Sequence, residues 1–221
     1  MDRNADGFIM RDGEFISLDD VERMFSAASE FLDSPSKVAG MMIDLALDCE
    51  RKGRHGTAQA YLEKALGLFE TDRERSSCLL GIGLTRENAG DFAGAVEVYG
   101  RALGIDPGDK ETWYFLHNNT GYCLNELGRH GEAEGFCRKA IQIDPDRHNA
   151  HKNLGVALEG LGRHAEAAAS FLAAAEMCPE DQRAFRLLEE LSRSHPEIQG
   201  QVPDFRSRMD TCRTSTGASW N

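Results

Sequence analysis

Long hydrophobic runs, paired cysteines and an excess of basic residues are all missing from this 221-residue sequence. No apolar stretch approaches the roughly 20 residues that a helix needs to cross a bilayer, so we expect no membrane association. The six cysteines are scattered singly, without a Cys-x-x-Cys pair, which favours reduced and buried thiols. The start of the chain also lacks the basic and apolar regions of a secretory signal. These absences predict a cytoplasmic protein.

Basic residues are outnumbered, with 25 Lys and Arg against 37 Asp and Glu and a formal charge of −12. A general nucleic-acid binder needs a cationic surface to displace counterions from phosphates, so we expect no nucleic-acid partner. Residues 1–50 hold 12 acids and 4 bases, which is −8 of the total of −12. This segment either steers a basic partner or forms an ordinary solvated face.

Catalytic and metal-binding motifs are also missing. The sequence contains no phosphate-binding glycine loop, nucleophile elbow or His-Glu-x-x-His motif, so we expect neither an enzyme nor a cofactor. His117, His148 and His151 lie close in sequence, but no acid or cysteine completes a zinc ligand set. Residues 2–14 have the order of a calcium loop with Gly13 where the bidentate glutamate belongs, so turn formation is favoured and calcium binding is the alternative.

A repeat of 34 residues is the main positive signal, and it relates residues 114–147 to residues 148–181. Fainter copies occupy residues 39–72 and 76–109, so we predict four units with insertions of three and four residues between them. The aligned positions carry small residues, histidine and proline: Gly121 and Gly155, Gly128 and Gly162, His130 and His164, Ala133 and Ala167, Ala140 and Ala174, and Pro145 and Pro179.

Each unit reads as two amphipathic helices joined by a short turn that contains glycine. Small residues let two helix axes approach closely, and we expect Gly121 and Gly155 to face Ala133 and Ala167. Proline disfavours helical geometry in the residue before it, so Asp-Pro at 106–107 and again at 144–145 is expected to end the second helix.

The 34-residue length, the small-residue positions, the central glycine and the closing Asp-Pro together resemble the tetratricopeptide repeat (TPR) family. The resemblance covers about residues 39–181. It departs from the family pattern at His117 and His151, which replace a bulky aromatic, and at Glu70, which replaces the first proline. The resemblance implies an all-α fold, in which antiparallel helix pairs form a right-handed superhelical array, a TPR-like α-solenoid.

Three segments follow from these patterns. Residues 1–35 are predicted to form a small β-hairpin around Asp12-Gly13 and a helix from about 18 to 32. Residues 36–195 hold the four repeats and a capping helix at 182–194, because the end of such an array must cover an apolar face. Residues 196–221 have little periodicity, so we expect an irregular tail.

In this family the first helices of successive units line a concave face along which peptides lie. Amide side chains there can both donate to and accept from an extended backbone, and a lysine adds attraction to a ligand carboxylate. An ordinary solvated helix surface is the alternative reading. The implied peptide-binding residues are Asn118, Asn119, Tyr122, Asn125, Asn149, Lys152 and Asn153.

Apolar residues occupy the matching places in the first two units, namely Ile43, Leu47, Leu80 and Leu84. A full carboxylate clamp needs basic and amide residues there, so we reject it and predict an apolar groove that must be covered. Its cover is the N-terminal helix, a second copy of the chain or an apolar partner peptide. The leading hypothesis is a scaffold, adaptor or chaperone-like module that binds an extended protein or peptide segment. The alternative is a structural protein whose N-terminal repeats mediate homo-oligomerisation.

Overall fold

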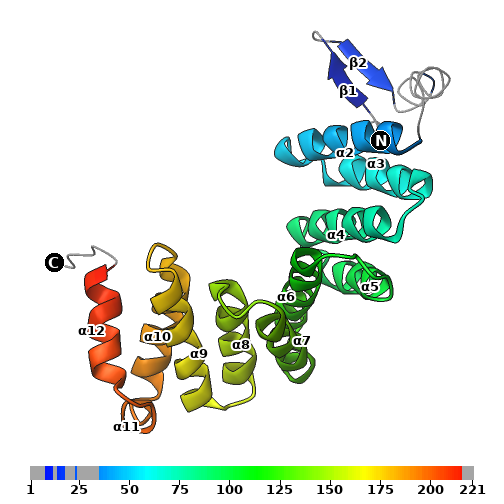
Figure 1. Ribbon diagram of the computed structural model, residues 1–221. Helices are drawn as coiled ribbons and strands as arrows, with labels where there is room; N and C mark the ends of the chain where they lie inside the picture. The colour runs from blue at the N-terminus through cyan, green and yellow to red at the C-terminus, as the bar shows by residue number, and fades with distance from the viewer. Residues whose placement is uncertain (1–7, 12–13, 18–22, 24–34, 216–221) are drawn as a thin grey trace. The chain divides into compact units, whose positions relative to one another are not determined.

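The computed structural model describes residues 8–11, 14–17, 23 and 35–215 (Figure 1). The chain divides into two compact units, residues 1–109 and 110–221, and each is described by itself. From residue 35 onward the described chain consists of helices and short connections. None of these described helices combines the length and the apolar character that a membrane crossing requires.

The first unit contains two antiparallel helix pairs. Helix α2 (Pro35–Arg51) packs against α3 (His55–Leu68), and α4 (Asp72–Asn88) packs against α5 (Phe92–Leu103). Helix α3 also contacts α4, so the two pairs stack. Small and large buried side chains alternate in the core, which includes Ala39, Ala46, Ala58, Tyr61, Leu79, Ile82, Ala95 and Tyr99.

The second unit begins with two further pairs of the same kind. Helix α6 (Lys110–Glu126) packs against α7 (His130–Ile143), and α8 (His148–Gly160) packs against α9 (His164–Met177). Helix α8 contacts both α7 and α6, which brings the first helices of the two pairs together. The four predicted helix pairs are therefore present, while the right-handed superhelix through all four stays a prediction.

A glycine with positive φ forms the turn inside every pair. Gly53, Gly90, Gly128 and Gly162 have φ values of 69°, 77°, 70° and 73°. In each turn the glycine amide and the next amide donate back to carbonyl oxygens of the preceding helix, as Gly128 N does to Asn125 O over 2.9 Å. This left-handed cap satisfies carbonyls at the helix end and costs a glycine little, because it has no β-carbon.

The glycines inside the first helices allow close approach of the second helices. A β-carbon on Gly121 would lie 2.6 Å from Cys137 Sγ and 3.4 Å from the Ala133 carbonyl oxygen. A β-carbon on Gly155 would overlap the ring of Phe171. The expected partner Ala133 therefore lies beside Gly121, whereas the atoms that a β-carbon on Gly155 would meet first belong to the ring of Phe171, one turn after Ala167.

Helix ends follow the proline signals in part. Helix α7 ends at Ile143, directly before Asp144-Pro145, as predicted. Helix α5 ends earlier, at Leu103, four residues before Pro107 and next to Gly104. Helix α10 (Gln182–Ser194) coincides with the predicted capping helix and buries Ala184, Phe185, Leu188 and Leu191.

The prediction of an irregular tail after residue 195 is wrong for most of that segment. Residues Ile198–Gln201 form α11 and Phe205–Ser215 form α12, both of which contact α9. Three residues of α12 are buried in the same core as Phe171 and Leu188. They are Phe205, Met209 and Cys212, a narrow stripe at helical spacing on an otherwise polar helix. That stripe was too short to outweigh the polar composition of the tail.

Two strands lie near the N-terminus, β1 (Phe8–Arg11) and β2 (Glu14–Ser17). They pair antiparallel, with Phe8 opposite Ser17 and Arg11 opposite Glu14. The predicted turn at Asp12-Gly13 lies outside the described residues, so the hairpin as a whole stays a prediction. The predicted helix at 18–32 and most of the possible calcium loop also lie outside the described residues.

Candidate interaction site

Four of the seven predicted peptide-binding residues are buried together where α6 meets α8. Their side chains form a hydrogen-bonded group and keep between 5% and 9% of their surface exposed. They are Asn118, Asn119 and Asn125 of α6 and Asn153 of α8. The sequence places these amides on the right helices, but the structure shows that they are not all free surface groups.

Asn125 has a structural role that the sequence analysis missed. Its Nδ2 donates to the main-chain oxygen of Asn153 over 2.8 Å, and its Oδ1 lies 3.2 Å from His130 Nδ1. The side chain therefore connects α6, α7 and α8. The signal available in the sequence is the histidine that recurs at the start of the second helix, at residues 130 and 164.

Asn118 joins the two remaining asparagines into a chain of amides. It donates from Nδ2 to Asn119 Oδ1 over 2.9 Å and accepts at Oδ1 from Asn153 Nδ2 over 3.1 Å. Within the described residues, Asn119 Nδ2 and Asn153 Oδ1 make no hydrogen bond, and neither atom is fully enclosed. One donor and one acceptor, on residues 34 apart, are thus held in place and left open.

The other three predicted residues, Tyr122, Asn149 and Lys152, are half-buried. Lys152 Nζ donates to Asn149 Oδ1 over 3.1 Å. Burial lowers the pKa of Lys152, and the positive charge of Arg183 lowers it further, whereas Asp181 opposes this shift. The lowered pKa means that the surroundings of Lys152 compensate the positive charge of its protonated form poorly.

Asp181 links the start of α10 to the start of α8. Arg183 donates to its two oxygens from Nε and Nη2, each over 2.7 Å, and His148 Nε2 lies 3.2 Å from Oδ2. Hydrogen bonds from Arg183 hold the pKa of Asp181 well below its usual range. Arg183 is not among the predicted site residues, because the sequence indicates only a capping role for α10.

The predicted apolar groove residues lie on α2 and α4 of the first unit. Leu47 and Leu84 are 56% and 37% exposed, while Ile43 and Leu80 are half-buried. Met41 is also 46% exposed. The described first helices of this unit thus carry exposed leucine and methionine side chains, while the groove itself stays a prediction.

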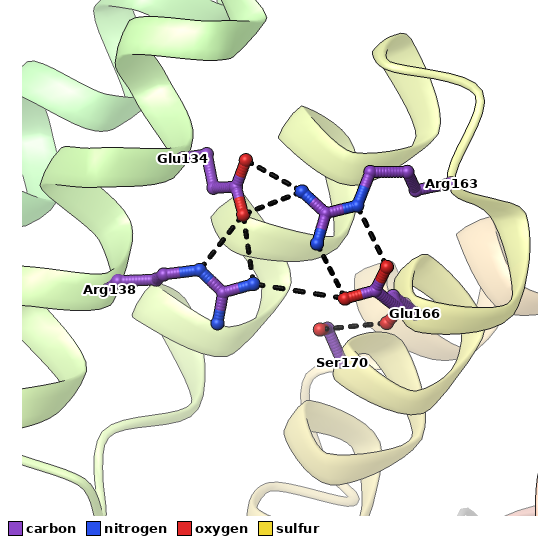
Figure 2. Close-up of polar contacts among 5 residues, drawn as sticks. All are labelled: Glu134, Arg138, Arg163, Glu166 and Ser170. Atoms are coloured by element: carbon purple, nitrogen blue, oxygen red, sulfur yellow. Dashed lines mark hydrogen bonds and ion pairs between the residues drawn. The ribbon is translucent and has the colours of Figure 1, made fainter.

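A network of charged side chains joins α7 to α9 (Figure 2). Arg163 donates to both oxygens of Glu134, over 2.7 and 2.8 Å, and to both oxygens of Glu166, over 2.8 and 2.6 Å. Arg138 donates to Glu134 over 2.9 Å and reaches Glu166 at 3.9 Å. These hydrogen bonds raise the pKa of Arg163 and lower those of both glutamates. The network holds neighbouring repeats together and leaves no spare charge for a ligand.

Metal ligands do not converge in the part of the chain that the structure describes, where no group of three or more His, Cys, Asp or Glu could hold an ion. His148 faces Asp181, and His151 Nε2 lies 3.0 Å from the Pro145 carbonyl oxygen. His117 Nδ1 lies 2.8 Å from the Trp113 carbonyl oxygen. The three histidines therefore have separate partners.

Models of the tetratricopeptide repeat match residues 43–110, 116–147 and 144–182, which together cover most of the helical repeats. The chain belongs to the tetratricopeptide repeat family. It is 26% identical over 149 residues to the photosystem I assembly protein Ycf3 of Acaryochloris marina (strain MBIC 11017), spanning 58% of this chain and 87% of Ycf3.

Solved TPR structures share the fold. A MamA structure from Desulfovibrio magneticus RS-1, beginning at its residue 41, is 19% identical with a TM-score of 0.64, over 81% of this chain and 97% of that one. The first TPR of Spaghetti (RPAP3), bound to the HSP90 peptide SRMEEVD, is 21% identical with a TM-score of 0.51, over 56% and 95%. At these identities the likeness shows the fold alone. It concerns the helical repeats and lends no support to the predicted hairpin.

Proposed function

We propose that this TPR protein is a cytoplasmic scaffold or adaptor that binds an extended protein segment along α6 and α8. The observation that carries the proposal is the open donor on Asn119 and the open acceptor on Asn153, both fixed by Asn118. An extended backbone presents alternating carbonyl and amide groups, which such a pair can satisfy whatever the ligand's side chains.

The relatives support an interaction role without defining this ligand. Ycf3 is named as an assembly protein, and the RPAP3 repeat is seen with a bound peptide. Preorganised amides also favour binding, because less side-chain entropy is lost when the ligand arrives. Affinity should then depend more on the ligand backbone than on its sequence.

The test uses partners recovered from a lysate of the source organism with the full chain as bait. The segment that binds is mapped, synthesised and measured by fluorescence anisotropy against the parent and the Asn119→Ala, Asn153→Ala double variant. Two net hydrogen bonds of about 1 kcal/mol each predict a loss of affinity of about tenfold or more. Asn88→Ala, on the exposed end of α4 in the other unit, is the matched control and should bind like the parent.

Equal affinities for the parent and the double variant would refute the assignment to α6 and α8. Circular dichroism melting of all three proteins must accompany the measurement, because Asn153 also donates to Asn118. If the double variant remains folded and binds with the affinity of the parent, the ligand binds at another site.

A second candidate function is homo-oligomerisation through the first unit, and the exposure of Leu47 and Leu84 favours it. Exposed apolar patches on a repeat protein mark interaction surfaces. Light scattering after size exclusion should then show a dimer or larger species that the Leu47→Gln, Leu84→Gln variant loses. Leu127→Gln with Leu161→Gln removes two leucines at turns that are 39% and 41% exposed, and it should not change the oligomeric state. A parent that stays monomeric at all concentrations would eliminate this function.

A further inference from the structure

The turns inside the two helix pairs of the second unit each carry an exposed leucine. Leu127 and Leu161 directly precede the positive-φ glycines of these turns. The equivalent turns of the first unit have Lys52 and Ala89 in this place and form around the same kind of glycine. The turn itself therefore does not require a leucine, and the apolar surface of the two side chains is available to a partner.

The two turns lie next to each other on one edge of the second unit, which we call the turn edge (residues 126–130 and 159–164). A β-carbon on Gly160 would overlap the ring of His130, so the start of α7 touches the end of α8. This contact joins the two turns directly. Leu127 and Leu161 consequently belong to one continuous surface.

An open hollow extends the turn edge toward α11. It has a volume of about 300 Å³. Gly162, His164 and Ala165 line it from the second turn and the start of α9, and Glu197 and Gln201 line it from α11 and the residue before that helix. This volume is at the lower end for ligand sites, so the hollow suits a single side chain of a partner.

Both arginines of the turn edge are already neutralised by carboxylates. Arg129 donates to the two oxygens of Glu132, each over 2.7 Å. Arg163 lies between Glu134 and Glu166 (Figure 2). These arginines therefore offer no positive charge to an anionic partner.

Three carboxylates on and beside the turn edge have no basic partner. Glu126, Glu159 and Glu190 form no ion pair with a lysine or arginine of the described residues. Burial raises the pKa of Glu159 and the charge of Glu190 adds to this shift, whereas His164 and His195 oppose it. The negative charge at this place is thus poorly compensated, and a cation brought by a partner would compensate it.

We propose that the turn edge binds a basic amphipathic segment of another protein. Its apolar side chains cover Leu127 and Leu161, and its lysines or arginines face the carboxylates of Glu126, Glu159 and Glu190. A second copy of this chain fits less well, because its formal charge of −12 repels an acidic surface. The turn edge is separate from the helix faces that carry the proposed peptide site, so the two assignments can fail independently.

The experiment measures the binding of labelled peptides to the full chain by fluorescence anisotropy. The probe is a peptide of about 14 leucines and lysines with helical periodicity, roughly four helical turns. One counterpart has glutamate in place of lysine, and the other has serine in place of leucine. We expect saturable binding of the probe and clearly weaker binding of both counterparts, because each lacks one of the two kinds of contact.

Two variants assign the binding to the turn edge. Leu127→Gln with Leu161→Gln should weaken probe binding by about tenfold or more, because two apolar contacts are lost. Glu126→Gln with Glu190→Gln should weaken it by about threefold or more and reduce its dependence on salt. All four side chains are exposed, so both variants should remain folded, which circular dichroism melting checks.

Matched variants of the first unit are the controls. Leu47→Gln with Leu84→Gln removes two exposed leucines, and Glu63→Gln with Glu70→Gln removes two exposed carboxylates. Both should bind the probe like the parent. A loss as large as that of the turn-edge variants would show general attraction of the probe and would overturn the proposal.

The remaining outcomes are equally decisive. Equal binding by the parent and the folded Leu127→Gln, Leu161→Gln variant overturns the proposal, as does equal binding of the glutamate counterpart. An oligomeric state that depends on Leu127 and Leu161 identifies a second copy as the occupant and refutes the basic segment. If the turn edge fails while partner binding still depends on Asn119 and Asn153, this inference is refuted and the proposed function stands.

Discussion

Asn125 Nδ2 and the main-chain oxygen of Asn153 lie 2.8 Å apart, so a side chain of α6 holds the backbone of α8. Both residues were expected to read a ligand. The buried hydrogen bond instead makes Asn125 part of the contact between successive repeats. Such a contact fixes the spacing of the two first helices, and the positions of Asn119 and Asn153 depend on that spacing.

Asn125→Ala should therefore lower the free energy of unfolding by about 1–3 kcal/mol, because it removes a buried hydrogen bond and leaves His130 without that acceptor. Urea denaturation followed by circular dichroism measures the change. Asn149→Ala removes a half-buried amide from the same unit and should lower the free energy of unfolding by a clearly smaller amount. Equal costs would show that the Asn125 contact does not stabilise the repeat junction.

Gly155→Ala should lower the free energy of unfolding by about 1–3 kcal/mol, because the added methyl group must displace the ring of Phe171. Gly135→Ala is the matched control on α7, where a β-carbon meets no atom within 4 Å. That change should instead stabilise by about 0.5–1 kcal/mol, since alanine loses less backbone entropy in a helix. Thermal or urea unfolding distinguishes the expected loss of stability from the expected gain. A Gly155→Ala variant with unchanged stability would contradict the close approach of Gly155 to the ring of Phe171.

The sequence sufficed for the repeated parts of the fold because the same physical signals recur four times. Positive-φ glycines, small residues at helix contacts and amphipathic spacing each appear in successive units, and their agreement predicts helix pairs. Helices α11 and α12 occur once, and the stripe of Phe205, Met209 and Cys212 is the sequence signal for α12. A single stripe on a polar segment gives a weak signal.

The candidate site was less predictable for a different reason. Their positions in the helix show that Asn118 and Asn125 lie near the contact between α6 and α8. Those positions do not show which of their amide atoms form hydrogen bonds with neighbouring side chains. Those partners come from other helices: His130 of α7 for Asn125, and Asn153 of α8 for Asn118. The contribution of Arg183 likewise depends on where α10 packs, which the 34-residue repeat alone does not specify.

Phe205→Ala should detach α12 from the second unit. The side chain is 4% exposed in the core that contains Phe171, and its removal should cost about 3–5 kcal/mol of local stability. Hydrogen exchange of the α12 amides should accelerate strongly, while exchange in α6 changes little. Arg206→Ala, an exposed neighbour, is the control and should leave both rates within error. Slow exchange in folded Phe205→Ala would contradict the docking of this helix.

Arg163→Gln should lower the urea midpoint more than Arg129→Gln does. Arg163 binds glutamates of two helices, Glu134 and Glu166, whereas Arg129 pairs with Glu132 of its own turn. These side chains are accessible to solvent, so the difference should shrink in about 1 M salt, where charges are screened over about 3 Å. A difference that is independent of salt would indicate packing by the arginine stem instead of ion pairing.

Phe205, Met209 and Cys212 of α12 are buried in the same core as Phe171 and Leu188, so within the described residues this helix covers apolar side chains of the last helix pair. Head-to-tail polymers of repeat proteins need two complementary ends, and here one of them is already occupied by the chain itself. Any filament built by stacking copies on this end would first have to displace α12.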